Sequence, residues 1–115
     1  MRLRFDRESR LWIYSLGKIA QCHVHIDRQA SVRNADATIM TFFVAEPWRG
    51  RHIGQRLLRE VLGHLYRQRR VYRVELSDCS LRHRQPHNIY VNAGFRYVGD
   101  DNLMRVNLRS ALQKT

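Results

Sequence analysis

The sequence predicts one domain of the α/β class, in which helices pack against a mixed β-sheet. Its 115 residues are enough for a single hydrophobic core but not for two. Apolar residues alternate with polar ones in the first part of the chain, as in strands with one buried face, whereas after Gly50 they recur at helical spacing. We expect the domain to span residues 1–108, followed by a C-terminal tail over residues 109–115 whose last residues fray.

Strands dominate the first part of the chain. Leu3 and Phe5 alternate with arginines, and the second and third segments are joined at Gly17-Lys18, a short turn that indicates a hairpin. The fourth segment is a nearly continuous apolar run with many β-branched and aromatic residues, which predicts a central strand buried on both faces. The four expected strands cover residues 1–6, 11–16, 19–26 and 38–45, with a polar loop over residues 28–36.

After the fourth strand, the spacing of the apolar residues changes from the pattern of strands to that of a helix. A helix opens at Gly50–Gly54 and ends in a basic cluster at residues 67–70, where cations suit the negative end of the helix dipole. A strand, a second helix that starts near Pro86, and a closing hairpin follow. In order, the later segments are a strand over residues 71–78, a helix ending at Gly94, and strands over residues 95–98 and 103–108. The predicted order is therefore four strands, a helix, a strand, a helix and two strands, which gives a mixed sheet with helices packed on it.

The net charge of +11 is the main anomaly in the composition. Almost all of it comes from arginine, because Lys18 and Lys114 are the only lysines. The planar guanidinium group suits phosphate, which favours an anionic partner, although arginines that are merely solvated on the surface would give the same net charge.

The sequence shows no membrane-spanning or metal-binding pattern. No apolar run approaches the roughly 20 residues of a membrane span, and the first residues lack the apolar core of a signal peptide. Cys22 and Cys79 lie far apart, which fits buried free thiols in a reducing cytoplasm, and we expect a cytoplasmic protein. His23 and His25 share a strand face from which Cys22 points away, and no metal-ligand spacing occurs, so we expect no metal site.

A candidate anion site follows the fourth strand. The chain runs from Val44 into a glycine-bearing turn, Arg49 to Gly54, that begins the first helix. Backbone N–H groups at a helix N-terminus lack intrahelical partners, and the helix dipole adds partial positive charge. Both features favour an anion there, and Arg49 and Arg51 add charge; a plain strand–helix junction with solvated arginines is the alternative.

This stretch resembles motif A of the GCN5-related N-acetyltransferases (GNAT), which reads (Gln or Arg)-x-x-Gly-x-(Gly or Ala) after a strand ending near Val-x-x-Pro. Arg49 and Gly54 match its first and last positions, and His52 stands where the pattern has its middle glycine. We expect the backbone φ angle of His52 to have the negative value usual for residues other than glycine, and its side chain to add bulk beside the phosphates. The resemblance covers residues 38–108 and implies a GNAT-like fold with acetyl-coenzyme A as co-substrate. It implies that the pyrophosphate of acetyl-coenzyme A is bound around Phe43, Val44, Arg49, Gly50, Arg51, His52, Ile53, Gly54 and Gln55.

A second match lies downstream. Tyr90, Gly94 and Phe95 fit the family's motif B, Tyr-x-x-x-Gly-Phe. In relatives this tyrosine lies beside the coenzyme sulfur and gives a proton to the departing thiolate, so the resemblance implies a general acid at Tyr90. A phenol with a pKa of about 10 is a suitable donor to a thiolate with a pKa of about 8.5. Taken alone, Tyr90 is better explained as a residue that packs the short helix against the sheet.

The general base is harder to assign. The resemblance implies direct attack of an amine on the thioester, with a backbone oxyanion donor near Phe43 and Val44. Glu46, which follows the central strand, is the candidate base. Glu75, Asp78 and His83 are the alternatives, and each of these side chains is also explained as an ordinary surface or loop charge.

The front of the chain departs from the family pattern. Relatives insert two helices between their first two strands, which help to wall the acceptor site, whereas only Arg7 to Arg10 separate the strands here. A homodimer or docking on a macromolecule would complete the acceptor site. We expect an N-acetyltransferase acting on an amine of an acidic acceptor, either a protein or an RNA-linked acceptor such as an aminoacyl-tRNA. The alternatives are a non-catalytic acetyl-coenzyme A-binding regulator of a partner protein and a nucleic-acid binder without coenzyme.

Overall fold

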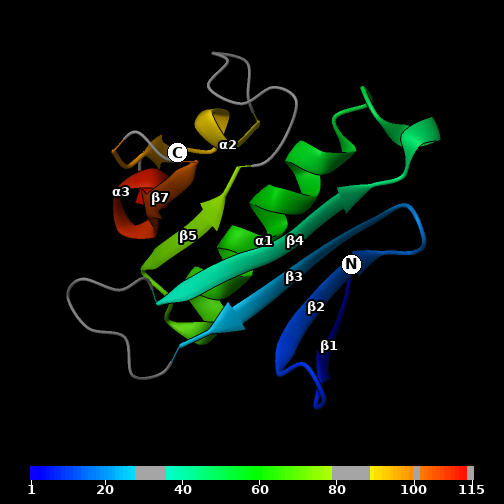
Figure 1. Ribbon diagram of the computed structural model, residues 1–115, viewed down its shortest axis with the longest axis horizontal. Helices are drawn as coiled ribbons and strands as arrows, with labels where there is room; N and C mark the ends of the chain where they lie inside the picture. Colours follow the sequence, from blue (N-terminus) through cyan, green and yellow to red (C-terminus); the bar gives the residue numbers. More distant parts are fainter. Residues whose placement is uncertain (28–35, 79–88, 100–101, 114–115) are drawn as a thin grey trace.

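The computed structural model describes residues 1–27, 36–78, 89–99 and 102–113, and it confirms the predicted class of fold. Its strands form one seven-stranded sheet in the order β1-β2-β3-β4-β5-β7-β6 (Figure 1). The strands are β1 (Arg2–Asp6), β2 (Leu11–Leu16), β3 (Ala20–Ile26), β4 (Ala37–Val44), β5 (Arg73–Ser77), β6 (Arg96–Tyr97) and β7 (Leu103–Asn107). The helices are α1 (Ile53–Arg69), α2 (Ile89–Asn92) and α3 (Leu108–Gln113), with a 3-10 turn η1 at Glu46–Trp48.

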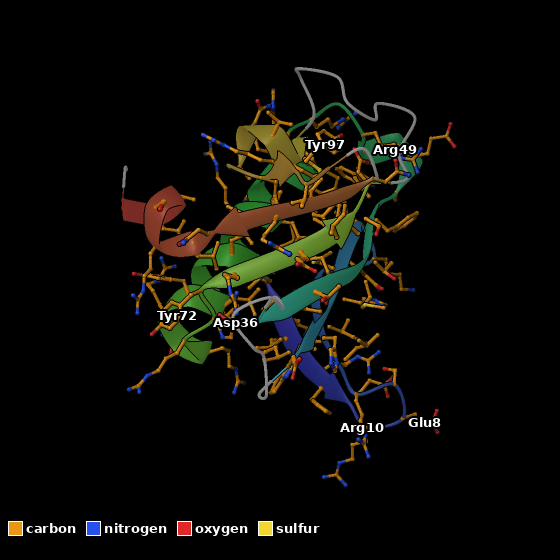
Figure 2. All side chains as sticks on the ribbon, turned by 60° about the vertical axis from the view of Figure 1, so that its left-hand side comes forward. Glu8, Arg10, Asp36, Arg49, Tyr72 and Tyr97 are labelled. Atoms are coloured by element: carbon orange, nitrogen blue, oxygen red, sulfur yellow. The ribbon has the colours of Figure 1, made fainter. Side chains whose placement is uncertain are left out.

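The first four strands form an antiparallel meander. β1 and β2 are joined directly by a turn over residues 7–10, in which the Arg10 N–H donates to the Asp6 carbonyl at 2.8 Å. Arg10 and Glu8 lie at the tip of this hairpin (Figure 2). The structure therefore confirms that no helix separates the first two strands.

The sheet buries one face under α1. Cross-strand partners share a face of a sheet, and Tyr14, Cys22 and Phe42 are in register across β2, β3 and β4. Tyr14 and Cys22 are fully buried there with the apolar stripe of α1. In Figure 1, α1 passes behind β3 and β4. We call the opposite side the outer sheet face; its register row through β1 to β4 is Arg4, Ile13, His23 and Thr41.

β4 changes its pairing halfway along. Its register with β3 shifts because Ile39 pairs with Val24 and Thr41 with His23, which leaves Met40 as the extra residue of a β-bulge. Parallel pairing with β5 covers only residues 37–39, although β4 continues to Val44. The prediction that this strand is buried on both faces is wrong, because only Ala37 and Ile39 are buried, whereas Met40 is 59% and Phe43 is 48% exposed. The second half of β4 thus separates from β5 and presents an open edge.

The C-terminal part differs from the sequence prediction. The predicted fraying tail is wrong for residues 109–113, which belong to α3. The helix forms because Leu108 is fully buried and the Asn107 side-chain oxygen accepts hydrogen bonds from the N–H groups of Arg109 and Ser110. α3 packs on α1 and β7. The predicted start of the second helix near Pro86 and the predicted loop over residues 28–35 lie outside the described residues.

Candidate functional site

The turn between β4 and α1 combines two residues with positive φ. Gly50 has φ 78°, and His52, the N-cap of α1, has φ 60°. The expectation of ordinary φ at His52 was wrong, because the chain enters α1 through a left-handed residue. This position favours glycine, which carries no Cβ, and that preference explains why the GNAT pattern has glycine there.

The N-terminus of α1 is available to an anion. His52 makes no side-chain capping hydrogen bond, and the first turn of α1 contains no acidic residue. The N–H groups of the first turn have no intrahelical acceptors, and the dipole of this 17-residue helix adds partial positive charge. Arg49 fixes the turn to the end of β4, because its Nε–H donates to the Val44 carbonyl at 2.9 Å.

A cavity of about 300 Å³ lies at this helix end. All the predicted coenzyme-binding residues except Phe43 and Arg51 line it, together with Trp48, Ile89 and Asn92, which the sequence did not single out. Arg51 instead lies over the Trp48 ring at 5.3 Å and lines an adjacent hollow of about 460 Å³ with Arg56 and Arg59. Three arginines therefore line the hollow beside the helix terminus together with Glu60, which pairs with Arg56 at 3.3 Å.

Gly54 acts in packing between three elements. A Cβ atom at this position would lie 3.2 Å from Val44 and 3.4 Å from Phe42, both on β4, and 3.7 Å from Ile89 of α2. The missing side chain allows α1 to approach β4 and α2 closely.

The open edge of β4 leads away from this cavity. The Ala45 N–H donates to the Ile19 carbonyl, so backbone groups of Ala45 and, by alternation, Phe43 face β3. Phe42 and Val44 face the other side, where β5 has separated, and the bond from Arg49 to the Val44 carbonyl lies on that side. In the described part of the chain, the N–H groups on this edge thus belong to Phe42 and Val44, whereas Phe43, near which the oxyanion donor was predicted, faces β3.

Tyr90 lies in the interior near this edge. Its ring makes edge-to-face contacts with Phe42 at 5.9 Å and Phe95 at 6.1 Å between centroids. Burial raises the pKa of the Tyr90 phenol, and the nearby Asp78 carboxylate raises this pKa further. The phenol therefore keeps its proton throughout the neutral range.

The candidate bases occupy different environments. Glu46 is exposed on η1 and is not among the residues that line the 300 Å³ cavity. Glu75 pairs with Arg105 of β7, whose Nε–H donates to it at 2.8 Å. Asp78 was expected to be a surface or loop charge, but it is 1% exposed and accepts a hydrogen bond from the Tyr97 hydroxyl at 2.7 Å. The period-two pattern of Val74, Leu76 and Asp78 was the signal for this burial. His83 lies outside the described residues.

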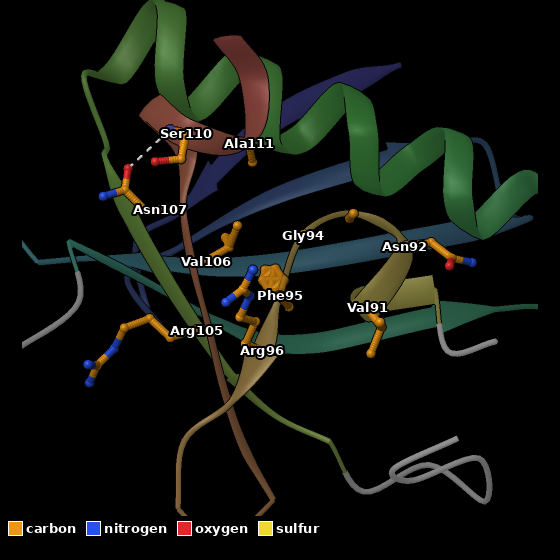
Figure 3. Close-up of a pocket in the computed structure, with 11 residues that line it drawn as sticks. Val91, Asn92, Gly94, Phe95, Arg96, Arg105, Val106, Asn107, Ser110 and Ala111 are labelled. Carbon is orange, nitrogen blue, oxygen red and sulfur yellow. Dashed lines mark hydrogen bonds between the residues drawn. The ribbon is translucent and has the colours of Figure 1, made fainter. Parts of the chain in front are cut away.

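Other features lie apart from the turn. A larger hollow of about 690 Å³ lies between the segment after α2, β7 and α3, and none of the predicted site residues lines it (Figure 3). Cys22 is a buried free thiol, and burial raises its pKa. In the described part of the chain, no group of three or more His, Cys, Asp or Glu side chains is placed to hold a metal ion.

The sheet order, the separation of β4 from β5 and the helix N-terminus without a side-chain cap after β4 are those of the GNAT-like acyltransferase fold. The family model described as "Acetyltransferase (GNAT) domain" matches residues 7–97. The chain belongs to the GNAT acetyltransferase family, and it is an N-acetyltransferase that uses acetyl-coenzyme A as co-substrate.

Solved structures share this fold at low sequence identity. A GNAT-family acetyltransferase from Staphylococcus aureus is 19% identical, with 86% of this chain and 67% of that chain covered and a TM-score of 0.61. A mutant of the AtaT toxin, bound to the C-terminus of the antitoxin AtaR and acetyl-CoA, is 14% identical, with coverage of 94% and 74% and a TM-score of 0.71. A mutant of the spermidine N-acetyltransferase SpeG from Vibrio cholerae is 10% identical, with coverage of 91% and 69% and a TM-score of 0.62.

A search of curated proteins found no match. Among the helices that the structure describes, none is long and apolar enough to cross a membrane.

Proposed function

We propose that the turn from Arg49 to Gly54 binds the pyrophosphate of acetyl-coenzyme A, and that the pantetheine arm follows the open edge of β4 toward Tyr90. The observation that supports this proposal is the cavity at the N-terminus of α1, which all the predicted coenzyme-binding residues except Phe43 and Arg51 line. The adjacent hollow with Arg51, Arg56 and Arg59 adds cations for the remaining phosphate of the coenzyme.

The chemical step is direct transfer. The amine nitrogen attacks the thioester carbonyl, and a β4 backbone N–H on the open edge, from Phe42 or Val44, stabilises the oxyanion. As the C–S bond breaks, the Tyr90 hydroxyl gives its proton to the sulfur, the nitrogen gives up a proton to a base directly or through water, and the tyrosinate regains a proton from solvent. A thiolate leaving into the same buried space is also more basic than in water, so the raised pKa of Tyr90 remains compatible with proton transfer.

The acceptor is an amine of an acidic macromolecule, either a protein or an RNA-linked acceptor. The net charge of +11 attracts such a partner and repels a polyamine. Exposed arginines also stand on the outer sheet face, among them Arg2 and Arg4 of β1 and Arg96 of β6. A cationic acceptor would instead require exposed carboxylates near the site.

A second reading is a non-catalytic regulator that binds acetyl-coenzyme A and a partner protein. The observation that favours it is the direct turn over residues 7–10, which leaves no helices between β1 and β2 to wall the acceptor. The structure of AtaT with the C-terminus of its antitoxin is a precedent for a protein partner on this fold.

Two measurements test the proposed function. Acetyl-coenzyme A should raise the melting temperature, because a ligand that binds only the native state stabilises it; no shift at saturating ligand would contradict the proposed site. Acetyl transfer is then assayed with aminoacyl-tRNA, basic and acidic protein acceptors, and spermidine. Thermal stabilisation without consumption of acetyl-coenzyme A by any acceptor would favour the regulator over the enzyme.

Tyr90→Phe separates binding from chemistry. It should leave the thermal shift caused by acetyl-coenzyme A unchanged and lower kcat by about 100-fold or more, as expected for the loss of a general acid. Wild-type activity in this variant would remove Tyr90 from the mechanism.

A further inference from the structure

An exposed tryptophan lies beside the cavity at the N-terminus of α1. Trp48 ends the 3-10 turn η1, which contains no buried residue, and it is 39% exposed. It also lines the cavity of about 300 Å³ in which the proposed coenzyme site lies. Trp12, in contrast, packs edge-on to the Phe5 ring at 4.9 Å and against the Arg69 guanidinium at 3.9 Å. Trp48 therefore offers aromatic surface to a ligand in the cavity.

Arg51 lies against the ring of Trp48. Its guanidinium carbon is 5.3 Å from the ring centroid, which is within the range of a cation–π contact. Trp48 lines the cavity but not the adjacent hollow of about 460 Å³, whereas Arg51 lines the hollow but not the cavity. The pair thus stands between the two, and the indole belongs to the cavity side.

The cavity and the hollow are continuous around the start of α1. Three residues line both of them: His52, Ile53 and Gln55. In the hollow, Arg51 and Arg59 present exposed guanidinium groups, while Arg56 pairs with Glu60 at 3.3 Å. A ligand with a phosphate at the turn from Arg49 to Gly54 is therefore able to reach both Trp48 and the arginines of the hollow.

The nucleotide end of coenzyme A matches this arrangement of side chains. Beyond its pantetheine arm, the coenzyme carries a pyrophosphate, an adenine base and a further phosphate on its ribose. The flat face of a base stacks on an aromatic ring without needing a particular hydrogen-bond pattern. Guanidinium groups suit phosphate oxygens in charge and in geometry. With the pyrophosphate at the turn, the indole and the hollow are left for the other two groups.

We propose that Trp48 stacks on the adenine of the coenzyme and that Arg51 and Arg59 bind its ribose phosphate. The chain then selects free acetyl-coenzyme A over an acetyl group carried on the phosphopantetheine arm of a carrier protein, because that arm has neither adenine nor ribose phosphate. This inference rests on the proposed coenzyme site and adds to it the specificity for the donor.

The test measures the binding of shortened donors by calorimetric titration, which requires no acceptor. Acetyl-coenzyme A is compared with acetyl-dephospho-coenzyme A, which lacks the ribose phosphate, and with acetyl-phosphopantetheine, which also lacks the adenosine. Loss of the ribose phosphate should weaken binding to wild type by about 5-fold or more. Loss of the adenosine should weaken it by about a further 10-fold.

Two variants assign these losses to residues. Trp48→Leu should weaken the binding of both nucleotide-containing donors by about 10-fold and leave acetyl-phosphopantetheine unchanged, whereas Trp48→Phe should keep most of the affinity. Arg59→Gln should weaken acetyl-coenzyme A alone by about 5-fold. Arg70→Gln is the matched control, because Arg70 is an exposed arginine at the other end of the same helix, and it should bind all three donors like wild type.

Fluorescence gives a direct readout of the stacking. The chain has two tryptophans, so Trp12→Phe leaves Trp48 as the single source of tryptophan emission. In this variant, acetyl-coenzyme A should quench the emission more strongly than acetyl-phosphopantetheine does at saturation.

The outcomes separate this inference from the proposed function. Equal affinity of wild type for acetyl-coenzyme A and acetyl-phosphopantetheine overturns the inference and leaves the proposed site standing. The same holds if Trp48→Leu weakens all three donors equally, because the ring would then act on the turn or the pyrophosphate. If wild type binds none of the donors, the proposed coenzyme site fails and the inference fails with it.

Discussion

His52 carries backbone strain at the entrance to the proposed coenzyme site. With φ at 60°, it occupies a region that costs a residue with a Cβ about 1–2 kcal/mol relative to glycine. His52→Gly should therefore raise the free energy of unfolding by up to about 1 kcal/mol and preserve or tighten coenzyme binding. Chemical denaturation and calorimetric titration with acetyl-coenzyme A measure the two effects.

Gly50 provides a control, because its substitution should change the free energy of unfolding in the opposite direction. At φ 78° and with open space around a Cβ, Gly50→Ala introduces strain without a clash and should lower stability by about 1 kcal/mol. If His52→Gly clearly weakens coenzyme binding, the imidazole has a contact of its own with the ligand.

The Tyr14–His64 pair makes stability depend on pH. Tyr14 is fully buried, with its pKa raised to about 12 by burial, and its hydroxyl lies 2.8 Å from His64 Nδ1. Burial, followed by Arg69 and Arg67, lowers the pKa of His64 below its ordinary 6.5. The unfolded chain then binds more protons than the folded chain below that value, so this contribution to stability is present above it and is lost as the pH falls.

His64→Gln tests this dependence, because glutamine keeps hydrogen-bonding capacity without titrating. The free energy of unfolding should fall more steeply on acidification in wild type than in His64→Gln. Equal slopes in denaturation series over the same pH range would show that His64 does not contribute.

At the scale of elements, α3 should be part of the stable fold. Leu108→Ala removes a fully buried side chain at its start and should lower the free energy of unfolding by about 2–5 kcal/mol. Ser110→Ala, on the exposed side of the same helix, should stay within about 0.5 kcal/mol of wild type in the same denaturation experiment. Similar values for the two variants would mean that α3 is not docked in solution.

Helices and strands whose apolar residues recur regularly over many positions were predictable from the sequence. α1 buries six residues, and β3 buries Ala20, Cys22 and Val24 on one face, so their patterns are strong. The predicted buried face of the first strand is wrong, because β1 has no buried residue and Phe5 is 42% exposed. α3 was missed because six residues give less than two helical turns of pattern. The bulge at Met40 depends on which residues of β3 pair with β4, and a single strand does not contain that information.

Part of the candidate site was also predictable from the sequence. The turn and Tyr90 belong to short sequence motifs, whose residues and spacing can be recognised without knowledge of the fold. The left-handed φ of His52 and the hydrogen bond from Tyr97 to Asp78 arise from how the turn and the strands are assembled. The turn residues except Arg51 line one cavity, whereas the roles of individual residues are proposals that the experiments above test.

At the scale of the whole molecule, charge should govern the encounter with the acceptor. With a net charge of +11, kcat/KM for an acidic macromolecular acceptor should fall steeply as salt increases, while kcat at saturation changes little. A double variant, Arg2→Gln with Arg4→Gln, should reduce the salt slope without altering the thermal shift caused by acetyl-coenzyme A. An unchanged slope would place the acceptor on another face of the protein.

The topology of the sheet also sets an order of assembly. β1 to β4 pair with their neighbours in sequence, so their contacts close short loops and should form early, whereas pairing of β4 with β5 must wait for the crossover through α1. The proposed site on the separated half of β4 is complete only when α2 packs against it, about forty residues after the proposed phosphate-binding turn. A ribosome-bound chain that has released only the meander and α1 therefore has the proposed anion-binding turn but lacks Tyr90, the proposed acid, so the proposed catalytic arrangement is completed late in synthesis.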